Sequence, residues 1–177
     1  MTAAIVGIAA LVVVLVAIAL LYNRLVGARN RTRYAWSDID ALLVRRAQTV
    51  PRLVEAVRGS MTHERSVFEA VAATRAGVAE VAGSGPSDAR YAAEQRFGDA
   101  GAQLVAVVEN YPELRASETV AQLIAALQDL ENDLRRARIV YNRTVQTYQD
   151  ARLAFPSSLV AGAFGFRPVP YFGDAAA

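Results

Sequence analysis

One histidine in the chain is followed directly by a glutamate, and the two could begin a zinc-peptidase motif. His63-Glu64 matches the start of H-E-x-x-H, in which two histidines on one helix face bind zinc and the glutamate acts as a base. The position of the second histidine holds Val67, and the sequence has no other histidine. The motif therefore predicts no zinc site, and we expect His63 to be exposed and to cap the start of a helix.

Two pairs of aspartates could bind a metal or serve as an acid and a base. Asp38 and Asp40 are too close in sequence to share a helix face. Asp129 and Asp133 do share a face, but it lies outside the predicted hydrophobic seam, where water screens both charges. Because the chain also lacks cysteine, we predict no catalytic residue, no metal site and no cofactor, and hence no enzyme. A hydrolase with an unrecognised site is the weakest alternative.

A basic run, Arg135, Arg136 and Arg138, could bind an acidic partner protein or anionic lipid head groups. The simpler interpretation is a solvated helix face, on which Glu131 and Arg135 form an ion pair one helical turn apart. Nucleic-acid binding is not expected, because the net charge of +2 is small and both signs are mixed along the chain.

The tail, residues 156–177, is apolar, aromatic and rich in glycine and proline. Residues such as Gly165, Pro168 and Pro170 oppose a regular helix in its second half. Apolar surface of this extent needs a cover, which could be the chain's own bundle, the membrane surface or a partner protein. The candidate membrane or partner contacts in and next to this tail are Phe155, Phe164, Phe166, Arg167, Tyr171 and Phe172.

These candidates must be positioned by helices, and the first helix has the composition of a membrane span. Residues 1–23 carry no charged side chain and are mostly Ala, Val, Ile and Leu. About 20 helical residues at ~1.5 Å each cross the ~30 Å hydrocarbon core of a bilayer. A cleaved signal peptide is the alternative, but the stretch lacks a basic start and ends in Leu21-Tyr22-Asn23 rather than in small residues. We therefore predict an uncleaved transmembrane anchor over residues 1–23.

The arginines that follow the span set its expected orientation. Arg24, Arg29, Arg31 and Arg33 come directly after it, whereas only the α-amine precedes it. Cytoplasmic flanks of membrane helices carry the excess of basic residues. We expect a single-pass protein of the cell membrane, with its N-terminus outside and its C-terminal domain in the cytoplasm.

Residues 24–155 show helical periodicity in four segments. In the first, Pro51 is expected to bend the helix and the long stem of Arg46 to reach solvent. In the last, apolar residues keep an unbroken 3,4 spacing from Val120 to Ala151, which is typical of a coiled coil or a long bundle helix. The predicted breaks are Gly59-Ser60, Gly83–Pro86 and Tyr111-Pro112, with Ser117 as the N-cap of the last helix and Phe155-Pro156 as its end.

No useful stretch alternates with period two, so no sheet is expected. The sequence predicts an all-α protein, in which an N-terminal transmembrane helix precedes an antiparallel four-helix bundle. The first and last bundle helices are the longest and should pair beyond the middle two. An even number of antiparallel helices also returns Phe155 to the membrane side of the bundle.

Many short blocks of this sequence, in order from about residue 21 to 173, resemble the LemA family. The blocks that carry the resemblance are Leu21–Val26, Arg29–Arg31, Ala35–Asp40, Arg45-Arg46, Val50–Glu55, His63–Arg65, Tyr111–Leu114, Arg138–Asn142, Phe155–Ser158, Phe164–Phe166 and Tyr171-Phe172. The resemblance implies a four-helix bundle on an N-out anchor. It also implies an association with membrane-bound zinc peptidases and envelope-stress systems.

The interpretation that best fits these observations is a membrane-anchored helical scaffold or adaptor that faces the cytoplasm. The alternative is an accessory or regulatory subunit of a membrane-bound zinc peptidase or envelope-stress system. The expected partners are the lipid bilayer and a protein in the membrane, and the sequence leaves a homo-oligomer open.

Overall fold

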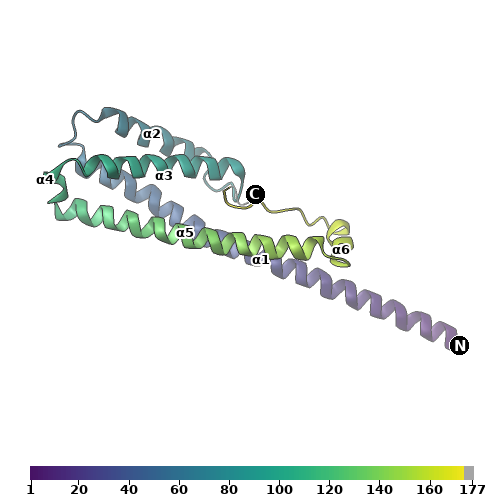
Figure 1. Ribbon diagram of the computed structural model, residues 1–177. Helices are drawn as coiled ribbons and strands as arrows, with labels where there is room; N and C mark the ends of the chain where they lie inside the picture. Colours follow the sequence, from purple (N-terminus) through teal and green to yellow (C-terminus); the bar gives the residue numbers. More distant parts are fainter. Residues whose placement is uncertain (174–177) are drawn as a thin grey trace.

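The computed structural model describes residues 1–173, and every regular element in this range is a helix. The helices are α1 (Thr2–Val57), α2 (Arg65–Glu80), α3 (Asp88–Val108), α4 (Pro112–Arg115), α5 (Glu118–Leu153) and α6 (Ser157–Ala163) (Figure 1). Residues 174–177, the last four of the predicted tail, lie outside the described residues. The predicted all-α class is confirmed.

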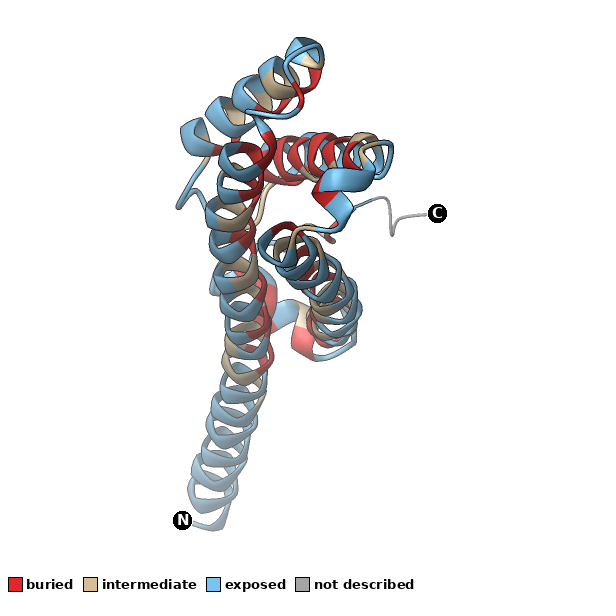
Figure 2. Ribbon diagram, turned by 90° about the vertical axis from the view of Figure 1, so that its left-hand side faces the viewer, coloured by how far each residue is buried: buried red, intermediate tan, exposed pale blue. Residues whose placement is uncertain are grey.

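Helix α1 combines the predicted anchor and the first bundle helix in one uninterrupted element of 56 residues, which continues through Pro51. Its apolar N-terminal part projects beyond the bundle (Figures 1 and 2), and residues 2–20 are exposed throughout. By length and composition, this part of α1 is able to cross a membrane. Burial begins at Leu25, where the bundle starts to cover α1.

The bundle consists of two antiparallel pairs. The long helices α1 and α5 lie side by side, and the shorter α2 and α3 form a hairpin next to them (Figure 1). With 16 and 21 residues, α2 and α3 are shorter than the 36-residue α5. The α1–α5 pair therefore extends beyond the hairpin toward the anchor, as the sequence predicted.

Local sequence explains where the middle helices begin and end. Ser87 caps α3, because its hydroxyl accepts a hydrogen bond from the Arg90 N–H. Gly83 and Gly85 adopt positive φ angles in the preceding loop, a conformation that favours glycine. Helix α3 ends at Val108, slightly before the predicted break, and the short α4 then leads into α5.

The buried side chains form three clusters along the bundle axis, and Figure 2 marks the buried positions of the ribbon in red. Phe97 and Leu104 lie in the cluster far from the anchor, and Leu134 lies in the middle one. The third cluster surrounds Tyr148 next to the anchor. The predicted α5 seam faces this interior, since its members from Val120 to Ala151 are buried or half-buried.

Candidate functional site

The tail folds back from the end of α5 and packs on the bundle. Helix α6 lies beside α1 directly after the exposed apolar residues 2–20. Val160, Ala161 and Phe166 are buried there against Leu25 and Ala28. The tail is thus covered at the membrane end of the bundle, which is where antiparallel helix counting placed Phe155.

Side chains of α5 hold the extended backbone that follows α6. The Tyr148 hydroxyl donates a hydrogen bond to the Arg167 carbonyl at 2.8 Å. The next residue of α5, Gln149, donates a hydrogen bond from its side-chain amide to the Val169 carbonyl at 3.1 Å. These bonds fix the course of the chain without depending on the tail's own side chains.

Two further contacts clamp the end of the described tail. The Tyr141 hydroxyl donates to the Pro170 carbonyl at 2.9 Å, and Tyr91 of α3 lies 3.1 Å from the Tyr141 oxygen. The Asn142 side chain both accepts from the Phe172 N–H at 2.8 Å and donates to the Phe172 carbonyl at 3.2 Å. Asn142 therefore binds this residue as a neighbouring strand would.

An aromatic cluster surrounds the clamped residue. The Phe172 ring lies 4.3 Å from the Tyr91 ring and 6.2 Å from the Trp36 ring, measured between centroids. Burial raises the pKa of Tyr91 and Tyr141 above the ordinary value, so both hydroxyls stay protonated and can act as donors. Residues of three helices, α1, α3 and α5, thus pack around the Phe172 side chain.

The candidate tail residues divide into two groups. Phe166 and Phe172 are buried in the chain's own bundle, and Tyr171 is half-buried. Phe155 and Phe164 are 82% and 57% exposed, and the Arg167 side chain is also exposed. Packing on the bundle therefore accounts for only part of the aromatic content of the tail.

Exposed apolar side chains of the tail lie at the end of the bundle next to the anchor. The Phe164 ring lies 5.0 Å from the ring of Tyr22, the residue that follows the apolar run. Large exposed apolar groups at the α5–α6 junction and on α6 complete this surface, which we call the foot: Tyr22, Leu153, Phe155, Leu159 and Phe164.

A buried ion cluster in the bundle was missed by the sequence analysis. Arg46 of α1 is 2% exposed, so the expectation that its stem reaches solvent is wrong. Its guanidinium lies 2.6 Å from the Glu94 carboxylate and 3.1 Å from that of Glu131. Gly98 makes room for it, because a Cβ at that position would lie 2.8 Å from an Arg46 nitrogen.

Glu94 has a second cationic neighbour. Arg90 is 3% exposed, lies 3.0 Å from Glu94 and 3.1 Å from Asp40, and donates to the Val81 carbonyl. Asp40, one of the aspartates considered for chemistry, is therefore an ion-pair partner. One signal in the sequence could have revealed this cluster. Arg46 is a charged residue that occupies a position of the apolar stripe of its helix, where a buried side chain is expected.

The basic run on α5 does not make the predicted ion pair. Glu131 is bound to Arg46 instead of Arg135, with 3.1 Å between the guanidinium and the carboxylate. Arg136 pairs with Asp133 on the surface. Arg138 turns inward and lies 4.4 Å from the centroid of the Phe172 ring. The three arginines thus have three different environments.

His63 lies exposed in the loop between α1 and α2, as expected. Its predicted capping role is wrong, because Glu64 is the N-cap of α2 and makes no side-chain capping bond. Within residues 1–173, no cluster of three or more His, Cys, Asp or Glu side chains could hold a metal.

Comparison with known proteins supplies the family. The model of the LemA family matches residues 35–177, which include the bundle, the clamp and the tail. The chain belongs to the LemA family. The resemblance noted in the sequence blocks is confirmed.

Curated relatives of this LemA family member include magnetosome proteins. The magnetosome protein MamQ of Magnetospirillum gryphiswaldense is 25% identical over 176 residues, covering 86% of this chain and 65% of the relative. Magnetosome proteins MamQ 1 and MamQ 2 of Paramagnetospirillum magneticum are each 24% identical over the same shares. The chain thus spans about 65% of the length of these relatives. Family and apolar helix together identify a membrane-associated helical protein.

Proposed function

We propose that this LemA family protein is a membrane-anchored scaffold or adaptor, whose bundle faces the cytoplasm and rests on the membrane through the foot. The observation that carries the proposal is the position of the foot, in which Phe164 contacts Tyr22 where the apolar part of α1 ends. A helix that leaves the bilayer at this point brings the foot to the level of the lipid head groups.

The chemistry of the foot suits that level. Aromatic side chains favour membrane–water interfaces, and exposed Leu159 and Phe155 gain from removal from water. Arg24 and Arg167 are both exposed near this end of the bundle and could meet anionic lipid. Anchor and foot would then hold the bundle at two points and restrict its tilt.

The proposed role is non-catalytic because the chemistry-bearing residues are engaged elsewhere. Asp40, Glu94 and Glu131 form ion pairs with buried arginines, and the single histidine lies in an exposed loop. Exposed apolar side chains on the outer surface of α5, Ile139 and Val140, offer a protein partner a contact.

The foot can be tested in the full-length chain, which has no native cysteine. Single cysteines at Leu159→Cys and Thr62→Cys, at opposite ends of the bundle, would carry a bimane label in nanodiscs containing brominated lipid. We expect strong quenching at position 159 and none at position 62. Equal quenching at both positions, or none at either, would contradict contact between the foot and the bilayer.

The adaptor role needs a protein partner. A photo-crosslinking amino acid at Ile139, with Thr62 as the control position, would trap that partner in intact cells for mass spectrometry. Recovery of one membrane protein from position 139 alone supports an adaptor. Recovery of a zinc peptidase would favour the accessory-subunit role, and identical products from both positions would contradict a specific surface.

A further inference from the structure

A groove of about 560 Å³ lies between α3 and α5, with α1 as its floor. It is formed because α2 and α3 pair with each other, while α5 pairs mainly with α1. Its volume is within the range of small-molecule sites, roughly 300–1,000 Å³. This groove lies away from the foot and plays no part in the proposed membrane contact.

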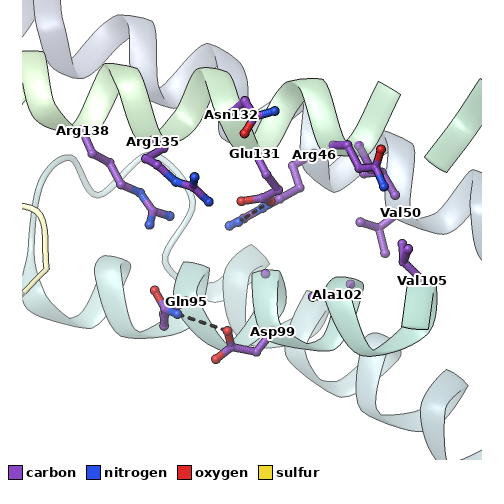
Figure 3. Close-up of a pocket in the computed structure, with 14 residues that line it drawn as sticks. Arg46, Val50, Gln95, Asp99, Ala102, Val105, Glu131, Asn132, Arg135 and Arg138 are labelled. Carbon is purple, nitrogen blue, oxygen red and sulfur yellow. Dashed lines mark hydrogen bonds and ion pairs between the residues drawn. The ribbon is translucent and has the colours of Figure 1, made fainter. Parts of the chain in front are cut away.

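The two ends of the groove differ in chemistry (Figure 3). Val50, Val105 and Leu127 give one part an apolar lining. Arg135 and Arg138 extend from α5 toward α3 at the other end. A ligand that filled the groove would therefore combine an apolar body with a group that complements two guanidiniums.

Among residues 1–173, the Arg138 guanidinium lies over the Phe172 ring and pairs with no carboxylate. None of the ion pairs formed within residues 1–173 includes Arg135 or Arg138. The Arg138 Nε is buried and has no hydrogen-bond partner within the same residues. Burial, and next the positive charge of Arg46, lower the pKa of Arg138, while the carboxylates of Glu131 and Glu94 oppose this shift only in part. An anion beside it would remove this cost.

The acidic residues of the groove are already engaged. Glu131 binds Arg46, and Asp99 accepts a hydrogen bond from the side chain of Gln95 on the α3 wall (Figure 3). Arg135 and Arg138 are three positions apart on α5, so their guanidiniums share a helix face. This pair can bind the two oxygens of one carboxylate or phosphate group.

We propose that the groove between α3 and α5 binds a small amphipathic oxyanion. Its head group contacts Arg135 and Arg138, and its short apolar chain lies over Val50, Val105 and Leu127. Both a carboxylate and a phosphate monoester have the required head group, and the same titration distinguishes them.

The test is calorimetric titration of the full-length chain in nanodiscs, with empty nanodiscs as the blank. The probes are hexanoate, hexyl phosphate and the neutral hexan-1-ol. Saturable one-site binding of either anion, with much weaker binding of the alcohol, is expected. Equal binding of the alcohol, or no binding of either anion, overturns the proposal.

Variants distinguish the site from non-specific attraction. Arg135→Gln and Arg138→Gln should each weaken binding about tenfold, as loss of a charged hydrogen bond does. Arg135 is exposed, so its replacement leaves the fold intact. Arg136→Gln is the matched control, because Arg136 pairs with Asp133 outside the groove. Equal affinity in the Arg135→Gln and Arg136→Gln variants overturns the proposal.

A second pair of variants tests the apolar end. Ala102→Leu adds volume inside the groove and should abolish binding of the preferred anion, whereas Ala106→Leu adds it on α3 outside the lining. Unchanged affinity in the Ala102→Leu variant, with circular dichroism confirming the helices, also overturns the proposal.

Discussion

At the scale of single residues, Glu94 is the group on which the buried charges depend. It is fully buried, and among residues 1–173 it is the one carboxylate paired with both Arg46 and Arg90. Removing one partner of a buried ion pair leaves an uncompensated charge, which is far more costly than the pair is favourable. The cluster therefore fixes how α1, α3 and α5 fit together.

Glu94→Gln should lower the free energy of unfolding of the bundle by about 3–5 kcal/mol, because two buried guanidiniums lose their shared counter-charge. The control is Glu131→Gln, whose side chain is 44% exposed and should cost no more than about 1 kcal/mol. Denaturation of the full chain in detergent, followed by circular dichroism, measures both. Similar losses would show that Glu94 has no special role.

The tyrosine pair predicts how tail docking responds to alkaline pH. The pKa of Tyr91 and Tyr141 is raised by burial, while in the unfolded chain both hydroxyls ionise near the ordinary value of about 10. The folded state therefore retains more protons, and stability present below about pH 10 is lost as the pH rises further. Melting temperatures between about pH 9 and pH 12 should fall less in the Tyr91→Phe/Tyr141→Phe variant. Tyr34→Phe, at a 71% exposed ring, should leave the fall unchanged.

At the scale of elements, the tail is held chiefly through its backbone. Tyr148, Gln149, Tyr141 and Asn142 are neighbours on one face of α5, and each contacts a main-chain group of the tail. A segment fixed in this way keeps its position even where its own side chains point to solvent, as Arg167 does. This explains how an irregular segment is positioned accurately enough to present α6 beside the anchor.

Asn142→Ala should release residues 170–173, because it removes both bonds to Phe172. Hydrogen–deuterium exchange of the full chain would show faster exchange in this stretch and unchanged exchange in α2. Asn132→Ala, at an exposed position of the same helix, is the matched control. Slow exchange in both variants would mean that the other hydrogen bonds and the aromatic contacts hold the tail without Asn142.

Periodicity predicted the helices because each buries one stripe, and the seam from Val120 to Ala151 is the clearest case. The ion cluster could not be predicted in the same way. Whether Arg46 reaches solvent or a buried carboxylate depends on how α3 packs against α1, where Gly98 leaves room for the guanidinium. The division of the tail aromatics likewise depends on contacts with helices distant in sequence, such as that between Phe172 and Tyr91.

At the scale of the whole molecule, α1 joins the apolar span rigidly to the bundle. Because the helix continues without a break to Val57 and is packed against α5 from Leu25 onward, a rotation of the span in the bilayer would turn the bundle with it. Contact of the foot with the membrane would oppose that rotation. Anchor, foot and bundle would then act as one oriented body, which suits a protein that presents a surface to a partner.

The arginines after the span predict the orientation of this body across the membrane. A single cysteine at Thr62→Cys should react with a membrane-impermeant maleimide only after cells are permeabilised, because the proposed orientation places the bundle in the cytoplasm. Replacing Arg24, Arg29, Arg31 and Arg33 by Gln, and adding two arginines after Met1, should make part of the chain reactive in intact cells. The control is Arg45→Gln/Arg52→Gln, which removes exposed charges of α1 farther from the span and should leave the labelling unchanged. Reaction of the unaltered chain in intact cells would place the bundle outside, and the proposed adaptor would then require a partner on that side.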